Sequence, residues 1–226
     1  MGEKRFGRFY KIIRQLVRMV LPKYSNKNIA PISKPTVYIS RHQNMSGPVS
    51  ILAWSNHFMH TWVFAPFLSQ ESCYQHYIDY TFTQRFGWPK FLAKIIAWPT
   101  SYFVSALLNS GRMLPVYRKS RKIIQTFKLS LNALLRNEDL LIFPEIDYTN
   151  TDISTSKIYE GFLHLEKYYY RETKKHLAFV PIYSDKERRE IRRGKAIYFT
   201  GKKKFIEERK EIVQEIQKEL NRLAGM

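Results

Sequence analysis

Residues 37–48 read Val37-Tyr-Ile-Ser-Arg-His-Gln-Asn-Met-Ser-Gly-Pro48, and the rest of the chain can be arranged around them. The apolar run lies between Pro35 and the Gly-Pro pair, which is typical of a short buried strand that stops abruptly. Arg41 and His42 follow at its carboxyl end, where open α/β sheets bind ligands. A histidine there can take a proton from an attacking hydroxyl, although a single histidine is more commonly a surface residue or a satisfied core residue. His42 is therefore a candidate catalytic base.

The bulk composition is that of a folded protein with one α/β domain. A chain of 226 residues can bury a sizeable core, and its 44% hydrophobic and 15% aromatic content is too high for a disordered segment. The single cysteine, Cys73, excludes an internal disulfide framework and a Cys-x-x-Cys metal site. We therefore predict no metal, and a reducing compartment is indicated.

The net charge of +19 indicates an anionic partner, which can be nucleic acid, anionic lipid or a phosphorylated cosubstrate. No basic and aromatic recognition motif accompanies the charge, which argues against nucleic acid. Apolar runs are interrupted by Asn56 and His57 in residues 49–68 and by Pro99 in residues 95–108, so no membrane-spanning helix is predicted. The first residues lack the pattern of a secretory signal. We expect a cytoplasmic protein that lies on the cytoplasmic face of an anionic membrane.

Residues 2–21 are predicted to form a basic amphipathic helix that ends at Pro22, and residues 23–36 form a polar linker. The apolar face of this helix can enter the headgroup layer of a membrane, where each basic residue contributes about 1 kcal/mol. Alternatively, it can pack on the domain and leave the basic face in solvent. The chain is thus divided into a helix and linker over 1–34 and a single α/β domain over 35–226. The apolar face of the helix over 2–21 carries Phe6, Phe9, Ile12, Ile13, Leu16, Val17 and Val20. Its basic face carries Lys4, Arg5, Arg8, Lys11, Arg14 and Arg18.

Strand and helix patterns alternate along the remainder of the chain. This alternation predicts the α/β class, with a central, mostly parallel β-sheet flanked by helices. A kink is expected near Pro99, inside the helix predicted over 88–109. The predicted strands are 37–40, 60–67, 111–118, 140–143, 178–183 and 195–200, and the predicted helices are 48–57, 70–86, 88–109, 120–136, 158–172 and 205–223.

Four segments between residues 35 and 185 together resemble the glycerophospholipid acyltransferase superfamily. The first motif of that superfamily, Asn-His-x4-Asp after a strand, is similar to Arg41 through Gly47. The second, a glycine and a strand that ends in arginine, is similar to Gly111 through Arg118. The third, Phe-Pro-Glu-Gly-Thr-Arg-Ser, is matched in part by Phe143-Pro144-Glu145, and the fourth is an apolar strand with a central proline, here Val180-Pro181-Ile182.

The resemblance implies transfer of a fatty acyl group from acyl-CoA or acyl-carrier protein to a hydroxyl of a glycerophosphate-type acceptor at a membrane surface. The thioester is a cosubstrate, and no bound cofactor is implied. His42 would be the general base, a carboxylate behind it would fix the ring, and basic side chains would hold the acceptor phosphate. By the motif matches, the substrate-binding residues would be Arg41, Gln43, Asn44, Gly111, Arg118, Phe143 and Pro144.

Two departures from the superfamily pattern leave open which carboxylate would hold the His42 ring. Gly47 stands where the motif aspartate belongs, and Ile146, Asp147 and Tyr148 replace Gly-Thr-Arg in the third motif. We hypothesise that Asp147 or Glu145 reaches His42 from the neighbouring strand end. Alternatively, Asp147 caps its own Thr/Asn-rich loop. The competing function is an acyltransferase-like protein with a disabled site that is retained to bind lipid or to act as a scaffold.

Overall fold

The computed structural model describes residues 6–26, 35–118, 120–145 and 158–225. Within these residues six strands form one sheet in the order β3-β2-β4-β1-β5-β6. All neighbouring pairs are parallel except β5 and β6, which form an antiparallel hairpin. The predicted α/β class with a mostly parallel sheet is confirmed. The strands are β1 Thr36–Ile39, β2 Met59–Phe64, β3 Leu114–Val116, β4 Asp139–Ile142, β5 Ala178–Asp185 and β6 Glu190–Arg193.

The last strand differs from its prediction. Residues 195–200 contribute one isolated bridge, between Ile197 and Phe179, whereas β6 lies at Glu190–Arg193. The charged run around β6 looks like a loop in the sequence. An edge strand tolerates such charges because one of its sides faces solvent.

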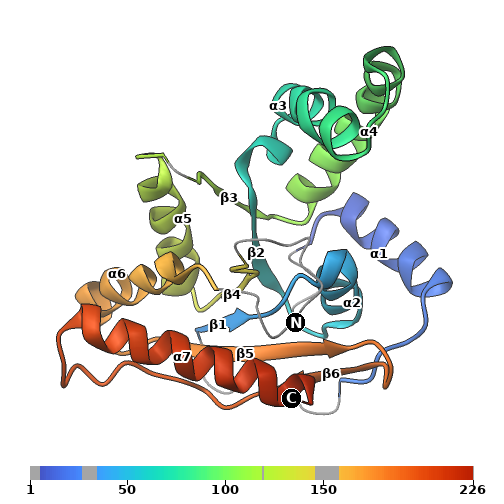
Figure 1. Ribbon diagram of the computed structural model, residues 1–226. Coiled ribbons are helices and arrows are strands. Elements are labelled where there is room, and N and C mark those ends of the chain that lie inside the picture. Colours follow the sequence, from blue (N-terminus) through green and yellow to red (C-terminus); the bar gives the residue numbers. More distant parts are fainter. Residues whose placement is uncertain (1–5, 27–34, 119, 146–157, 226) are drawn as a thin grey trace.

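Helices cover both faces of the sheet (Figure 1). The helices are α1 Arg8–Val20, α2 Ser46–Trp54, α3 Gln70–His76, α4 Lys90–Ser110, α5 Ile123–Leu135, α6 His164–Thr173 and α7 Phe205–Ala224. A π-helix, η4 Tyr77–Arg85, continues α3, and the 3-10 helices are η2 Gln43–Met45, η3 Ala65–Leu68 and η5 Glu160–Leu163.

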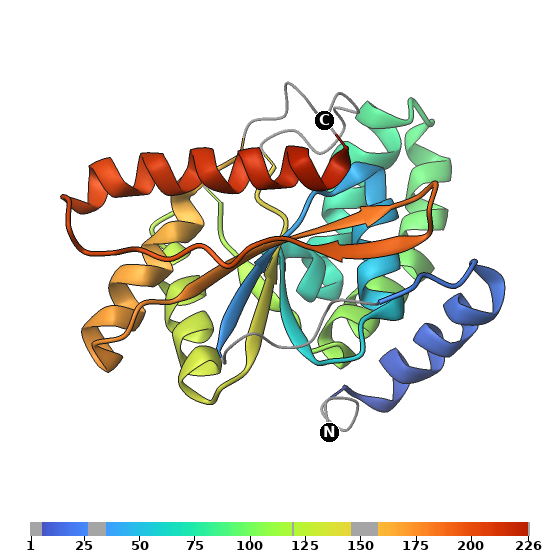
Figure 2. The ribbon, with the colours of Figure 1, turned by 90° about the horizontal axis from the view of Figure 1, so that it is seen from below.

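The alternation of side chains along β1 divides the core into two layers. Val37 and Ile39 pack with residues of α5, α6 and α7, and Tyr38 packs with Ile51 of α2 on the other face. All four side chains are fully buried. Successive side chains of a strand point to opposite faces, so β1 is buried on both sides, as the sequence predicts. Figure 2 shows α5 and α6 grouped apart from α2, α3 and α4.

α4 is one helix of 21 residues that continues through Pro99. Among the described residues it is the one helix long and apolar enough to cross a membrane by length and composition. The helix predicted over 88–109 is confirmed, whereas the prediction that Pro99 leaves no apolar run of membrane-spanning length is wrong. A proline removes one backbone donor and strains its turn, but the small inward residues Ala93, Ala97, Ser101 and Ser105 let the helix pack closely on α3 and η4.

α1 is a helix, and it packs on the domain partly through basic residues, which neither expectation included. Arg14 is buried, and its Nε donates to the carbonyl oxygen of Ala53 at 2.9 Å and its Nη2 to that of Ser55. Arg18 donates to the same Ala53 oxygen at 2.6 Å. These carbonyls belong to the last turn of α2, where four oxygens lack helical partners. The two arginines therefore cap α2, so Arg14 and Arg18 are not part of a basic face in solvent.

Candidate functional site

The carboxyl ends of three parallel strands bring most of the predicted site residues to one edge of the sheet. His42 follows β1, Phe143 and Glu145 follow β4, and Arg118 follows β3. The His42 and Phe143 rings meet edge to face, with their centroids 5.6 Å apart. The backbone N–H of His42 donates to Glu145 Oε2 at 2.5 Å. Glu145 thus joins the two strand ends that carry the first and third motifs.

The loop after β1 has an unusual backbone. Gln43, Asn44 and Met45 have positive φ angles of 47°, 51° and 79° in succession. Each such residue costs about 1–2 kcal/mol when it is not glycine. The turn is closed on His42, whose carbonyl oxygen accepts from the amides of Met45 at 3.0 Å and Gly47 at 3.3 Å. Strain of this kind is concentrated at functional sites, which supports this loop as a site.

Gly47 has a steric reason for its identity. A Cβ at this position would lie 2.2 Å from the carbonyl oxygen of Arg41 and 3.2 Å from that of His42. Both are backbone atoms and cannot rotate away. The aspartate of the superfamily motif therefore has no room on this backbone, so the loop and the missing carboxylate are parts of one change.

The ring of His42 is already engaged within the loop. Its Nδ1 accepts from the amide of Met45 at 3.3 Å, so a neutral ring in this arrangement carries its hydrogen on Nε2. Glu145 contacts the backbone of His42 rather than its ring. Of the two predicted carboxylates, Glu145 holds the loop in place, and Asp147 lies outside the described residues.

Burial, followed by the positive charges of Arg118 and Arg85, lowers the pKa of His42 from 6.5 to about 4. Both arginine side chains are exposed, and both lie close enough for their charges to act on the ring. The imidazole is therefore neutral at pH 7. A neutral ring is the form that can accept a proton, and the two guanidinium groups beside it can attract an anion.

The depressed pKa predicts acid sensitivity. The unfolded chain binds a proton on His42 below about pH 6.5 and the folded chain only below about pH 4, so folding stability is lost as the pH falls between these values. When the pH falls from 7 to 4.5, we expect the free energy of unfolding of His42→Gln to decrease by about 2 kcal/mol less than that of the wild type. Urea unfolding at both pH values measures this difference. Equal losses in the two proteins would contradict a buried neutral ring.

Arg41 lies on the other side of the sheet from His42. It is 2% exposed, and its Nη2 donates to Asn221 Oδ1 in α7 at 2.5 Å. Burial lowers its pKa, and the charge of Glu145 opposes that shift. The strand alternation explains the placement, because Arg41 follows Val37 and Ile39 toward α7 while His42 follows Tyr38 toward α2. Arg41 therefore fastens the loop to α7.

The other predicted residues are divided between the carboxyl ends and the amino ends of the parallel strands. Gln43 and Asn44 lie in the strained loop, where the Gln43 carbonyl accepts from Ser46 Oγ at 2.8 Å. Pro144 is buried, and its carbonyl accepts from the amide of Tyr159 at 2.7 Å. Gly111 does not join them, since it precedes β3 at the opposite edge and packs against Tyr10 of α1. Gly111 comes before β3 and Arg118 after it, so the motif match that paired them as substrate-binding residues joins the two opposite ends of one strand.

Arg85 is the residue that sequence reasoning missed. It ends η4, and its guanidinium lies 5.8 Å from the centre of the Phe86 ring. The available signal was a basic residue at the end of a long aromatic helix, with no motif attached to it. Its proximity to His42 arises from the packing of the α3–η4–α4 unit beside the sheet.

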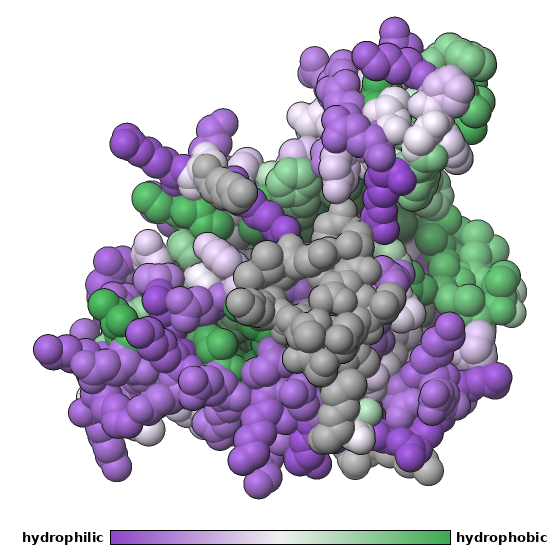
Figure 3. All heavy atoms as spheres, in the orientation of Figure 1, coloured by the Kyte–Doolittle hydropathy of each residue, from purple (hydrophilic) through white to green (hydrophobic). Residues whose placement is uncertain are grey.

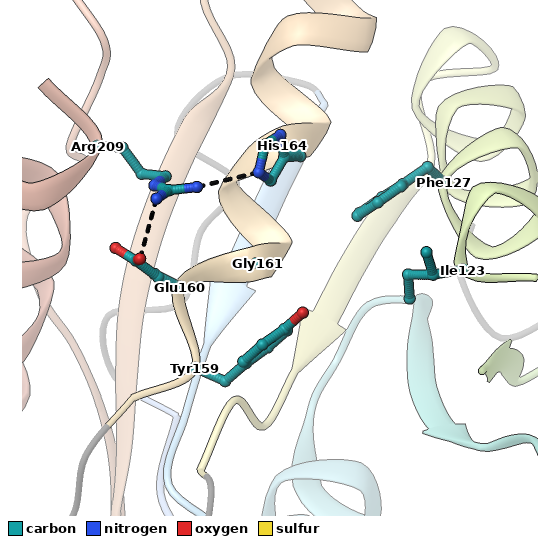
Figure 4. A pocket seen from close by; sticks show the side chains of 7 residues that line it. All are labelled: Ile123, Phe127, Tyr159, Glu160, Gly161, His164 and Arg209. Carbon is teal, nitrogen blue, oxygen red and sulfur yellow. Dashed lines mark hydrogen bonds and ion pairs between the residues drawn. The ribbon is translucent and has the colours of Figure 1, made fainter. Parts of the chain in front are cut away.

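A pocket of about 340 Å³ opens on the flank between α5, η5 and α7 (Figure 4). Ile123, Phe127 and the ring of Tyr159 form its apolar walls. Arg209 closes one side, where its Nη2 donates to Glu160 Oε1 and its Nη1 to His164 Nε2, each at 3.0 Å. Burial and the charge of Arg209 lower the pKa of His164, so this ring is the acceptor. None of the residues that line the pocket is one of the predicted site residues.

Comparison of the chain with protein-family models, curated proteins and solved structures found no match. Among the described residues, no three His, Cys, Asp or Glu side chains are grouped so as to hold a metal ion.

Proposed function

We propose that this protein transfers an acyl group from a thioester, acyl-CoA or acyl-carrier protein, to a hydroxyl of a phosphate-bearing acceptor of the glycerophosphate or lysophospholipid type. The single observation that carries the proposal is a neutral imidazole, His42, at the carboxyl edge of a parallel sheet with Arg118 and Arg85 beside it. The resemblance of the four sequence segments to glycerophospholipid acyltransferases supports the same chemistry.

In the proposed step, His42 takes the proton of the acceptor hydroxyl while its oxygen attacks the thioester carbonyl. The tetrahedral intermediate then collapses, the carbon–sulfur bond breaks, and the imidazolium returns the proton to the leaving thiolate. Base action at Nε2 requires the hydrogen on Nδ1, so the 3.3 Å contact with the Met45 amide has to be exchanged for an acceptor. Asp147 remains the proposed acceptor.

The acceptor phosphate has a second role in this proposal. Bound between Arg118 and Arg85, it would offset the two charges that lower the pKa of His42. The ring would become a stronger base when the acceptor is present. Binding of the phosphate-bearing acceptor would thereby raise the basicity of His42, the residue that then takes the proton from the acceptor hydroxyl.

The guanidinium of Arg118 can be tested by exchange for a neutral amide. Arg118→Gln is expected to raise the KM for a phosphate acceptor about tenfold and to raise the pKa of His42, because it removes a phosphate partner and a repulsive charge. Steady-state kinetics and NMR titration of the ring measure the two effects. Arg171→Gln is the matched control, since Arg171 is also exposed but lies at the end of α6. An unchanged KM and ring pKa would remove Arg118 from the site.

The second candidate function is a lipid-binding or scaffold protein with the same fold and a disabled site. Gly47 favours it, because the loop has no room for the motif aspartate. Release of free thiol from acyl-CoA in the presence of lysophosphatidic acid separates the two functions. His42-dependent release supports the enzyme, and its absence with every donor and acceptor supports the binding protein.

A further inference from the structure

The outer surface of α1 is apolar where a surface helix is ordinarily polar. Ile12, Leu16, Met19 and Val20 are 58%, 48%, 73% and 82% exposed, whereas Arg14 of the same helix is 7% exposed. A helix that packs on a soluble domain buries its apolar stripe. Here two arginines hold α1 against the end of α2, so the apolar stripe is directed outward.

α4 carries a second apolar stripe of the same kind. Phe91, Ile95, Trp98 and Tyr102 follow one another at steps of three and four residues, and they are 68%, 66%, 59% and 52% exposed. The opposite stripe, which includes Ala93 and Ala97, packs on Ile78 and Phe82 of η4. α4 is thus fixed to the fold along one face, and its other face exposes apolar side chains from Phe91 to Phe103.

The two stripes belong to one side of the molecule. The amide of Gly7 donates to the Ser110 carbonyl at 2.8 Å, and the Phe9 and Phe103 rings meet with centroids 5.8 Å apart. Figures 1 and 2 both place α1 and α4 on the side away from α5 and α6. Figure 3 shows hydrophobic surface gathered at the right edge, over α1. We call the exposed side chains of Ile12, Leu16, Met19, Val20, Phe91, Ile95, Trp98, Tyr102 and Phe103 the α1–α4 surface.

We propose that the α1–α4 surface inserts into the headgroup and upper acyl region of an anionic lipid bilayer. Basic residues accompany the apolar stripes, with Arg8 and Lys11 on α1 and Lys90 and Lys94 on α4. The chain carries a net charge of +19, which is complementary to anionic lipid. Two projecting helical ridges with Trp and Tyr suit an interface that yields to them, and aromatic residues favour the headgroup level.

This surface adjoins the candidate site without depending on its chemistry. η4 ends at Arg85, whose charge acts on His42, and α4 begins at Lys90. A bilayer under α4 would therefore lie next to the edge of the sheet that carries His42. Vesicle binding can be measured without any acyl donor, so it succeeds or fails independently of the proposed function.

The test is co-sedimentation with vesicles of phosphatidylcholine containing phosphatidylglycerol, compared with pure phosphatidylcholine. The Ile12→Glu/Leu16→Glu variant is expected to lower the partition coefficient on anionic vesicles by about tenfold or more, because two apolar anchors are lost. The matched control is Ile124→Glu/Ile206→Glu, which replaces side chains that are 50% and 62% exposed on α5 and α7 and makes the same change in charge. The control should bind as the wild type does.

Two further measurements secure the outcome. Circular dichroism checks that the Glu variant is folded, and an Ile12→Ser/Leu16→Ser variant serves if it is not. Brominated lipids should quench the tryptophan fluorescence of the wild type, and Trp98→Tyr should remove most of that quenching. Wild-type protein that stays in the supernatant of anionic vesicles would overturn the proposal. So would equal loss of binding in both Glu variants, or a wild-type dimer in solution that the Ile12→Glu/Leu16→Glu variant converts to monomers.

Discussion

His42→Ala is expected to lower the rate of thiol release from acyl-CoA about 10³-fold in the presence of lysophosphatidic acid. A positioned general base contributes roughly 10²–10⁴-fold to a proton-transfer step, and the alanine leaves nothing to take the hydroxyl proton. The ring also packs on Phe143 and accepts from the Met45 amide, so the loop loses a contact as well as a base. Continuous detection of free thiol measures the rate.

His42→Gln separates these two effects. The amide side chain is similar in length and can still accept a hydrogen bond, but it cannot act as a base. Its rate should be as low as that of the alanine variant. His176→Gln is the matched control, because His176 precedes β5 at the opposite edge of the sheet and bonds to Glu166 there. A glutamine variant with wild-type turnover would exclude His42 as the base.

Gly47→Ala is expected to lower the free energy of unfolding by about 3 kcal/mol, and Gly47→Asp by at least as much. The added Cβ would lie 2.2 Å from the Arg41 carbonyl oxygen, so the backbone between residues 41 and 47 has to move. That movement strains the hydrogen bond from the His42 amide to Glu145. Restoring the superfamily aspartate should therefore abolish thiol release rather than increase it. Urea denaturation and the thiol assay measure the two consequences.

The control for this substitution is Gly87→Ala. Gly87 has a φ of 70°, but a Cβ there would meet no atom within 4 Å, so the cost is the backbone conformation alone, about 1 kcal/mol. Gly47→Ala should be clearly the more damaging. A Gly47→Ala variant as stable as Gly87→Ala, or a Gly47→Asp variant with raised activity, would show that the loop is free to rearrange and that its form here is not obligatory.

The fold could be predicted where burial leaves a periodic signal. The runs that form β1, β4 and β5 are apolar on both faces, as strands inside a parallel sheet must be, and their order with the helices indicates the architecture. The orientation of α1 could not be predicted. Periodicity places Arg14 and Arg18 on a different face from Ile12 and Leu16. It does not predict that the two arginines donate to an unpaired backbone carbonyl oxygen at the end of α2.

The candidate site could be predicted to the level of strand ends. Parallel strands bring His42, Glu145 and Arg118 to one edge regardless of detail. The role of each side chain depends on its direction, which the sequence motif does not specify. Arg41 donates a hydrogen bond to Asn221, and Glu145 accepts one from the backbone of His42 rather than from its ring. Arg85 approaches His42 through the packing of η4, a contact with no counterpart in the order of residues.

The most direct test of the proposed acyl transfer is to look for the product itself. The chain is incubated with acyl-CoA and lysophosphatidic acid, and mass spectrometry follows the mass of the acceptor. The account predicts an acceptor heavier by one acyl group with the wild type, together with one equivalent of free CoA, and neither product with His42→Gln. If the wild type acylates no acceptor with any thioester donor or hydroxyl acceptor tested, the proposed acyl transfer is contradicted. That result would favour the second candidate function, a lipid-binding or scaffold protein.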